Sequence, residues 1–448
     1  MYSISSENTS KLHGEITVPG DKSISHRSLI LGSLVSGRIE IFNLLESEDV
    51  MATANALKTL GVSINKKKNS WEVYGQGIGN FYGNSHTLDM GNSGTATRLL
   101  MGIIAGSDVE ATFTGDQSLS KRPMRRVILP LLKTGAIFRE PEQSTLPLTL
   151  RGSKIPLPLT YTSPVSSAQI KSCILLCGLS SLGNTTVIEP SLSRDHTERM
   201  LKFLGAKIES TQLEDMSWQI SLEGLPDLKP LDITVPSDPS SAAFPIVAAI
   251  ITPNSQIKVK NICVNKLRMG LFKTLIEMGA HIELTNEREI GGELIADITS
   301  RSSDLTGIKV PKSRVPSMID EFPILSIAAA HAEGNTIMEG VEELRYKETD
   351  RIKAMCEGLQ NAGVETIDEK DKMVVKGKSK SNYIKGGVEI HSKLDHRIAM
   401  SFLCLGLTTK EPIVVKDAET INSSFPGFMD IMNKIGGKLQ NVSKKKLL

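Results

Sequence analysis

Residues 18–29 read VPGDKSISHRSL, the pattern of a short strand that turns at a Pro-Gly corner into an apolar helix. Three polar side chains gather at this corner: Lys22, Ser23 and Arg27. The free N–H groups and the positive dipole end of a helix already favour an anion, so two cations in the first turn have the wrong charge for the helix. The corner therefore predicts an anionic ligand that supplies the missing charge. An ordinary basic start of a helix is the alternative.

The same pattern recurs along the whole chain. A strand, a corner rich in Ser, Asp or Pro, an apolar helix and a second strand occupy residues 16–41, 88–113, 159–188, 233–259, 308–338 and 388–415. After each copy a second helix ends near a glycine, which suits the C′ position: Gly61, Gly135, Gly205, Gly279, Gly363 and Gly436. The helix after each corner is apolar on nearly every side, so we expect six buried helices with the sheets outside them.

At two places with similar sequence we expect the chain to cross from one domain to the other, and these places divide the six copies into two groups of three. They are Val18-Pro19-Gly20 and Val235-Pro236-Ser237. The sequence therefore predicts a continuous domain over 20–234 and a discontinuous domain made of 1–19 and 235–448. Two chain segments that cross together form a hinge, which we expect at 18–20 and 235–237.

Composition excludes several classes of protein. The 448 residues are 40% hydrophobic and carry a formal net charge of +2, which argues against a dedicated nucleic-acid binder. No uncharged apolar run approaches the length of a membrane span, and no signal peptide is expected. The five cysteines form no Cys-x-x-Cys pair and fit buried thiols in a reducing cytoplasm. The scattered histidines and the lack of Gly-rich nucleotide motifs predict no metal and no cofactor.

Charged residues at the corners are the candidates for chemistry. The cations suit a ligand with several phosphate or carboxylate groups, and they are Lys22, Arg27, Arg98, Arg122, Arg194, Lys347, Arg351 and Arg397. Arg122 as a surface residue, and Arg194 as a partner of Asp195, are the alternatives. Two acids, Asp320 and Glu348, are candidates for proton transfer. The alternatives are that Asp320 is an ordinary acid at the N-cap or first turn of a helix, and that Glu348 is an i,i+3 partner of Arg351.

Several of these motifs resemble one known family. PGDKSISHR (19–27), GNSGTATR (91–98), KRPM (121–124), SSAQ (166–169), KETDR (347–351) and DHR (395–397) look like the signatures of 5-enolpyruvylshikimate-3-phosphate synthase, in the family's order. SRDHTE (193–198) and IDEFP (319–323) look more like its divergent bacterial branch. The resemblance covers almost the whole chain.

The resemblance implies a fold and a reaction. The fold is α/β (α+β): a two-domain inside-out α/β barrel of six βαβαββ units, three per domain, with parallel buried helices. The reaction transfers the enolpyruvyl group of phosphoenolpyruvate to the 5-hydroxyl of shikimate 3-phosphate by addition and elimination, and it releases phosphate without a metal or cofactor. It belongs to chorismate and aromatic amino-acid biosynthesis. The family expectation is a cytoplasmic monomer, and the family is a target of glyphosate; the sequence leaves the sensitivity of this chain open.

Roles follow from the matched positions. The residues that resemble the shikimate 3-phosphate site are Lys22, Ser23, Arg27, Ser167, Gln169, Ser193, Arg194, Asp320 and Lys347. Those that resemble the phosphoenolpyruvate site are Lys22, Gly94, Arg122, Gln169, Arg351 and Arg397. Asp320 looks like the base for the attacking hydroxyl. Glu348 looks like the acid that protonates the methylene carbon, a role that Lys22 shares.

Three positions depart from the family pattern. Ser423 stands where much of the family has a lysine, Glu343 where the enteric branch has an asparagine, and Ala168 where a hydroxyl is common. Two rival functions stay open: a transferase of the same fold that acts on a UDP-amino sugar, and a catalytically silent anion-binding scaffold. The KETDR run favours the shikimate enzyme over the first, and acids at both 320 and 348 favour it over the second.

Overall fold

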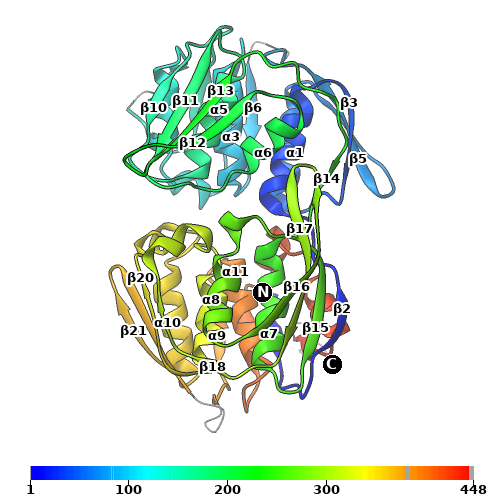
Figure 1. Cartoon of the computed structure of the whole chain (residues 1–448), viewed down its shortest axis with the longest axis vertical. Helices are drawn as coiled ribbons and strands as arrows, with labels where there is room; N and C mark the ends of the chain where they lie inside the picture. The colour runs from blue at the N-terminus through cyan, green and yellow to red at the C-terminus, as the bar shows by residue number, and fades with distance from the viewer. Residues whose placement is uncertain (1, 82, 84, 141, 379–383, 443–448) are drawn as a thin grey trace. The chain divides into compact units, whose positions relative to one another are not determined.

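The computed structural model describes residues 2–81, 83, 85–140, 142–378 and 384–442. The protein has a mixed α/β fold in two compact units (Figure 1). Unit 1 contains Met1–Pro19, Ser237–Arg288 and Leu294–Leu448; unit 2 contains Gly20–Pro236 and Glu289–Glu293. The short segment 289–293 thus groups with unit 2, whereas the sequence-based division assigned all of 235–448 to the discontinuous domain.

Unit 2 contains three four-stranded sheets among its described residues. The first has the order β14 (Ile233–Thr234), β3 (Ser36–Phe42), β5 (Ser70–Gln76), β4 (Ser63–Lys66). The second is β6 (His86–Asp89), β7 (Glu110–Thr114), β9 (Leu148–Arg151), β8 (Ile137–Phe138). The third is β10 (Thr160–Thr162), β11 (Asn184–Glu189), β13 (Trp218–Glu223), β12 (Ile208–Gln212). The helices are α1 (Lys22–Leu34), α2 (Glu48–Thr59), α3 (Gly94–Ala105), α4 (Arg125–Leu132), α5 (Ala168–Gly178) and α6 (His196–Phe203), with a 3-10 turn η1 (Leu119–Lys121).

Unit 1 repeats this arrangement. One sheet is β2 (His13–Ile16), β15 (Gln256–Cys263), β17 (Glu293–Arg301), β16 (His281–Ile290). The next is β18 (Leu305–Thr306), β20 (Ala332–Glu339), β22 (Lys372–Gly377), β21 (Glu365–Glu369), with β19 (Lys309–Val310) also paired to β20. The last is β23 (Glu389–His391), β24 (Ile413–Lys416), β1 (Ile4–Ser6), β25 (Leu439–Asn441). The helices are α7 (Pro239–Ile251), α8 (Gly270–Glu277), α9 (Phe322–Ala330), α10 (Arg351–Asn361), α11 (His396–Gly406) and α12 (Phe428–Lys434). The 3-10 turns are η2 (Lys266–Arg268), η3 (Lys312–Ser317), η4 (Glu342–Tyr346) and η5 (Ala418–Ser423).

All six sheets follow one pairing rule. In the orders given above the first two strands are parallel. The second and third strands are antiparallel. Parallel neighbours need a crossover, and in four of the sheets the buried helix after the corner supplies it: α3, α5, α9 and α11.

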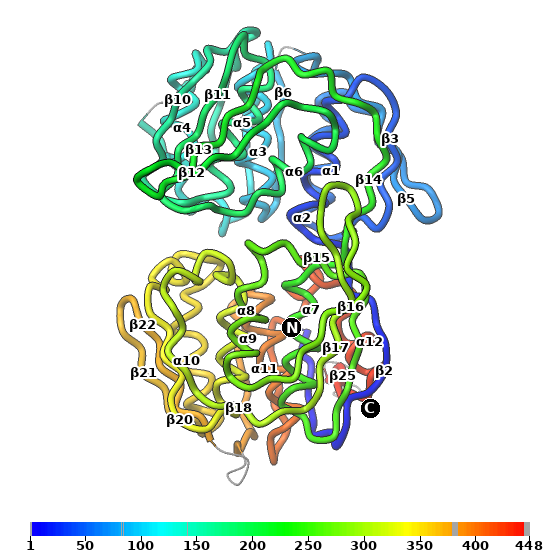
Figure 2. Tube along the Cα trace, in the orientation of Figure 1, coloured from blue at the N-terminus to red at the C-terminus, as the bar shows by residue number. Residues whose placement is uncertain are grey.

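The opening strands of the copies at 16–41 and 233–259 pair differently from those of the other four copies. β2 pairs with β15, with Ile16 opposite Val259, and β14 pairs with β3, with Ile233 opposite Ile41. The reason is the change of unit after Pro19 and after Pro236: the strand stays in the unit where it begins, and the helix starts in the other (Figure 2).

The corner helices carry the core, as their apolar sequences predict. All thirteen residues of α7 and all nine of α9 are buried, and α7, α9 and α11 pack against one another. In unit 2, α3 packs against α1 and α5. The α7 helix begins with Asp238 as its cap and Pro239 in its first turn, where a missing N–H costs nothing.

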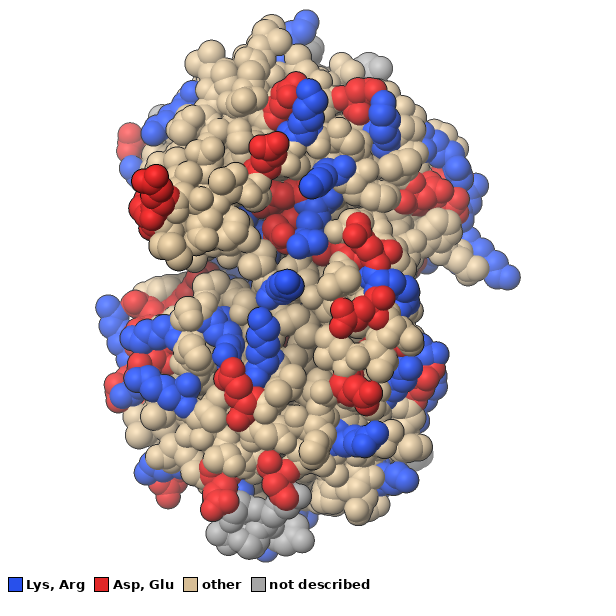
Figure 3. Space-filling model, in the orientation of Figure 1, with Lys and Arg blue, Asp and Glu red and all other residues tan. Residues whose placement is uncertain are grey.

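Charge is mixed over the surface. Lys and Arg alternate with Asp and Glu on the face drawn in Figure 3, in accord with the net charge of +2. Among the described residues, no helix has the length and apolar character needed to cross a membrane.

Candidate active site

The first corner of unit 2 places Lys22 beside an acid. Asp21 caps α1, and its Oδ1 accepts a hydrogen bond from the Ile24 N–H at 2.8 Å. The corner needs a glycine at position 20, because a Cβ there would lie 2.1 Å from the Asn43 carbonyl oxygen. The Lys22 ammonium forms an ion pair with Asp49, and its side chain stays 23% exposed. The lysine is thus held in place while it can still be reached by a ligand.

Arg27 joins three predicted parts of the site. It is buried, and its Nε donates to Thr197 Oγ1 at 2.7 Å while Nη2 donates to Ser172 Oγ at 3.0 Å. Its Nη1 donates to the Ser23 carbonyl at 3.1 Å. Burial lowers the pKa of Arg27 to about 10, although nearby acids oppose the shift, so the guanidinium stays charged at neutral pH. The α1 corner, α5 and α6 therefore meet around one cation.

A second group surrounds Gly94. A Cβ at Gly94 would lie 3.0 Å from Arg98 Nη1 and 3.3 Å from Arg122 Nη1, so both guanidinium groups approach this backbone closely. Arg98 Nη1 donates to Gln169 Oε1 at 2.7 Å. Arg122 Nη2 donates to Asn92 Oδ1 at 2.5 Å. The structure thus brings Gly94, Arg122 and Gln169 together with the candidate cation Arg98, and adds Asn92 as a partner of Arg122.

The predicted Ser193 lies against a buried ion cluster. Lys171 Nζ is 2.8 Å from Glu189 Oε1 and 2.8 Å from Glu198 Oε1, and all three side chains are nearly inaccessible. Burial alone lowers the pKa of Lys171, but Glu198 and Glu189 outweigh it and raise the pKa. Burial raises the pKa of Glu198. Sequence reasoning missed this cluster because Lys171 and Glu189 lie in runs with no motif, and the SRDHTE motif that contains Glu198 does not indicate its partner.

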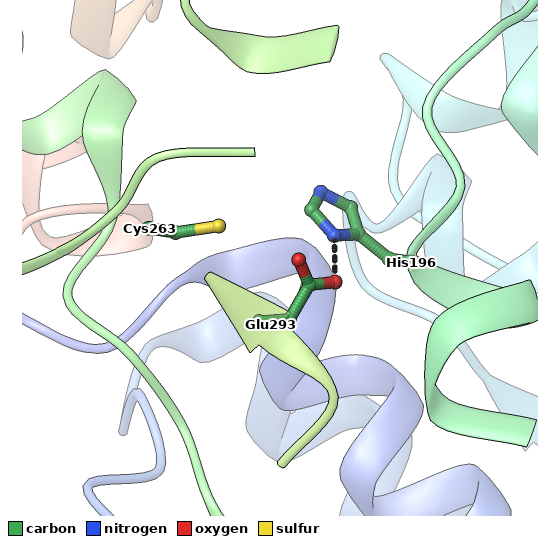
Figure 4. Close-up of side chains that lie close together, drawn as sticks. All are labelled: His196, Cys263 and Glu293. Atoms are coloured by element: carbon green, nitrogen blue, oxygen red, sulfur yellow. Dashed lines mark hydrogen bonds and ion pairs between the residues drawn. The ribbon is translucent and has the colours of Figure 1, made fainter. Parts of the chain in front are cut away.

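A second buried contact lies at the start of α6, three residues after Ser193. His196 Nδ1 and Glu293 Oε1 are 2.6 Å apart, and both side chains are 1% exposed (Figure 4). Both residues belong to unit 2, and the third labelled side chain, Cys263, belongs to unit 1. The contact ties the start of α6 to the segment 289–293.

In unit 1, Arg351 is the centre of the predicted residues. Its Nε lies 2.8 Å from Asp395 Oδ2, its Nη2 lies 2.6 Å from Glu348 Oε2, and its Nη1 lies 3.4 Å from Asp320 Oδ1. Burial alone lowers the pKa of Arg351. The three carboxylates, Asp395 first, outweigh burial and raise the pKa above its ordinary value. The guanidinium is therefore permanently charged and holds both candidate proton-transfer acids.

Lys347 and Arg397 complete this group. Lys347 Nζ lies 3.7 Å from Asp320 Oδ1. Arg397 Nη1 donates to the Asp320 carbonyl at 3.0 Å and lies 3.5 Å from Glu321 Oε1. All five residues predicted for this unit, Asp320, Lys347, Glu348, Arg351 and Arg397, thus lie in one connected cluster.

The ordinary alternatives fare differently. Glu348 is indeed an i,i+3 partner of Arg351, but it shares that partner with Asp320. Asp320 does not cap α9, whose N-cap is Glu321. Asp195 pairs with Arg199 at 2.8 Å rather than serving only its neighbour Arg194. At the departures, Ser423 Oγ lies 3.4 Å from His396 Nδ1, and Glu343 Oε1 lies 3.5 Å from Lys347 Nζ.

Asp395 lies in the DHR motif, but the sequence pattern did not predict a role for it. Its Oδ1 caps α11 by accepting from the Arg397 N–H at 2.9 Å, while Oδ2 holds Arg351. An acid immediately before a predicted helix signals a cap. Nothing in the local pattern signals its second bond, which reaches 44 residues along the chain.

Known proteins match this chain over nearly its full length. The family model EPSP synthase (3-phosphoshikimate 1-carboxyvinyltransferase) matches residues 6–432. The 3-phosphoshikimate 1-carboxyvinyltransferase of Parvibaculum lavamentivorans is 52% identical over 435 residues, 97% of this chain and 96% of that protein. The Bartonella quintana enzyme of the same name is 49% identical, over 96% of this chain and 97% of its own. The solved structure of EPSP synthase from Acinetobacter baumannii is 41% identical with a TM-score of 0.87, covering 98% of this chain and 100% of that one. The chain therefore belongs to the EPSP synthase family.

Proposed function

We propose that this protein transfers the enolpyruvyl group of phosphoenolpyruvate to the 5-hydroxyl of shikimate 3-phosphate and releases phosphate. The observation that carries the proposal is the Arg351 cluster. One buried, permanently charged guanidinium holds two carboxylates, Asp320 and Glu348, with Lys347 beside the first. Addition and elimination require a base, an acid and cations that stabilise phosphate and carboxylate charge, and this cluster offers all three.

The proposed binding roles follow the geometry of each unit. In unit 2, shikimate 3-phosphate is bound by Lys22, Ser23, Arg27, Ser167 and Gln169, with the Ser193–Arg194 segment at the phosphate. Lys22, Gly94, Arg122 and Gln169 bind phosphoenolpyruvate, where the lack of a side chain at Gly94 leaves the backbone open to the ligand. In unit 1, Arg351 and Arg397 also bind phosphoenolpyruvate, and Lys347 and Asp320 contact shikimate 3-phosphate.

The proposed proton transfers use the two acids in different directions. Asp320 accepts the proton of the 5-hydroxyl as its oxygen attacks C2 of phosphoenolpyruvate. Glu348 and Lys22 donate a proton to the methylene carbon. Elimination reverses the second transfer: the methyl group loses a proton as the C–O bond to phosphate breaks, and the enol ether forms. The surrounding cations balance the charge on the departing phosphate.

The finer features of the fold and setting are also proposals. Each unit is an inside-out α/β barrel of three βαβαββ units, a reading supported by the repeated pairing rule and by the buried helices. The domains 20–234 and 1–19 with 235–448 are joined by a hinge at 18–20 and 235–237. The protein works as a cytoplasmic monomer. The five buried free thiols, Cys173, Cys177, Cys263, Cys356 and Cys404, support a reducing compartment.

The test is phosphate release by the purified chain. We expect release only when phosphoenolpyruvate and shikimate 3-phosphate are both present, and we expect a chelator to leave the rate unchanged. Each substrate is omitted in turn as a control. Release with a UDP-amino sugar in place of shikimate 3-phosphate would instead assign the related transferase activity. If neither acceptor gives phosphate release, the remaining function is that of an anion-binding scaffold without catalytic activity.

A further inference from the structure

Ser193 has every hydrogen-bonding group engaged by the buried ion cluster. Its N–H donates to Glu189 Oε1 at 2.7 Å, and its hydroxyl donates to Glu189 Oε2 at 2.7 Å. Its carbonyl oxygen accepts a hydrogen bond from Lys171 Nζ at 3.1 Å. A serine hydroxyl has one proton to donate, and here that proton points at a carboxylate. The side chain expected to grip the substrate phosphate therefore has its donor committed elsewhere.

Lys171 is held by the same contacts. Its ammonium donates hydrogen bonds to Glu189 and to the Ser193 carbonyl and forms an ion pair with Glu198. The three side chains come from α5, β11 and α6, so the cluster fastens the loop between β11 and α6 at one residue. Arg194 follows Ser193 directly in the chain, so these contacts fix the position at which the backbone of Arg194 begins.

Stability alone does not account for this arrangement. A buried ion pair is often no more stabilising than apolar residues of the same size, because desolvation offsets the Coulomb attraction. The bonds of Lys171 and Glu189 converge on the backbone and hydroxyl of one residue rather than spreading through the core. Contacts that converge on one residue suit the precise placement of the next side chain, Arg194. In a site that works by orientation, a displacement of about 1 Å lowers activity by up to about 10²-fold.

We propose that Lys171 and Glu189 are positioning residues that clamp Ser193 and so aim Arg194 at the phosphate of shikimate 3-phosphate. Ser193 serves this clamp rather than donating to the substrate. The inference rests on the proposed function and deepens it: discrimination for the phosphorylated over the unphosphorylated acceptor depends on a buried ion pair that never touches the ligand.

The experiment measures binding of shikimate 3-phosphate and of shikimate to the full chain by calorimetry. The readout is the ratio of the two affinities. We expect Lys171→Met to lower this ratio about tenfold or more, and Lys171→Arg to recover part of it. Leu222→Ala, which empties a buried apolar position in the same unit, is the control for general destabilisation and leaves the ratio unchanged. An unchanged ratio in folded Lys171→Met overturns the proposal.

A double variant tests whether the clamp acts through Arg194. Arg194→Ala alone lowers the ratio, and adding Lys171→Met to it has no further effect if both changes remove the same interaction. Full additivity overturns the proposal. If Lys171→Met does not fold, Glu189→Gln, which keeps the shape of the side chain, replaces it in both measurements with the same expectations. Wild-type chain that binds shikimate 3-phosphate but shows no turnover contradicts only the proposed function, whereas wild-type chain that binds neither acceptor overturns both.

Discussion

Arg351 Nε and Asp395 Oδ2 form an ion pair at 2.8 Å in which the two side chains are 1% and 0% exposed. Asp395 also caps the helix that carries Arg397. One carboxylate thus orients two of the cations proposed to bind phosphoenolpyruvate. We expect its removal to affect both the stability of the fold and the proposed phosphoenolpyruvate site.

We expect Asp395→Ala to lower the free energy of unfolding by about 3–5 kcal/mol, because it leaves a buried guanidinium without its main partner. Urea unfolding measures the loss. Glu357→Ala is the matched control: it breaks two exposed pairs, with Lys353 and Lys393, each worth at most about 1 kcal/mol. Equal losses in the two variants would show that burial of the Arg351 pair does not matter.

Asp320→Asn removes the proposed base but keeps the size of the side chain and one acceptor oxygen. We expect kcat to fall by about 10²–10⁴-fold, the usual contribution of a general base, while the affinity for shikimate 3-phosphate changes little. Steady-state kinetics and calorimetry give the two values. Asp430→Asn, an exposed change in the same unit, is the control. Near-normal turnover would remove Asp320 from the mechanism.

Arg122→Ala separates the two substrates. Losing a charged hydrogen-bond donor costs about 1.5–3 kcal/mol, so we expect the Michaelis constant for phosphoenolpyruvate to rise about ten- to hundredfold. The constant for shikimate 3-phosphate should change much less. Arg126→Ala, an exposed arginine in α4, should alter neither. An equal rise in both constants would exclude Arg122 from the phosphoenolpyruvate site.

His26 makes the fold sensitive to acid. Burial, the largest effect, lowers its pKa to about 3 from 6.5, Asp49 opposes this, and Lys22 and Arg27 reinforce it. Between these pH values the unfolded chain binds a proton at His26 that the folded chain does not, so stability falls as the pH falls, by up to about 1.4 kcal/mol per pH unit.

We therefore expect His26→Gln to flatten the dependence of unfolding free energy on pH between 6 and 4. Urea unfolding at several pH values tests this. The exposed His281→Gln should leave the slope unchanged. His331, whose pKa burial also lowers, remains in both variants and contributes acid sensitivity of the same sign. A slope in His26→Gln identical to wild type would contradict the prediction.

The sequence predicted helices and corners well because their signals are local. Asp21, Ser93 and Asp238 cap helices that follow at once, and the apolar runs after them become buried helices. Strand pairing is a long-range property. Ile233 pairs with Ile41 across 192 residues, and no pattern near either residue names its partner. The sequence pattern therefore locates these strands without identifying their partners.

The residues of the candidate site also fall into two groups: those with a local sequence signal and those that only the fold brings together. Lys347, Glu348 and Arg351 lie in one short run, and the structure keeps them together. Buried charges such as Lys171 carry no motif, because an isolated lysine in an apolar helix looks the same whether its partner is water or a carboxylate. Their roles depend on Glu189 and Glu198, which only the fold brings near.

The placement of β1 between β24 and β25 sets an order of events during synthesis. Residues 4–6 are made before either of their neighbours in the sheet, residues 413–416 and 439–441. Every strand of the three unit 2 sheets has been made once residue 234 has emerged. The strand β1 therefore cannot take its place between β24 and β25 until all the strands of unit 2 have been made, and the last sheet of unit 1 is completed only after residue 441.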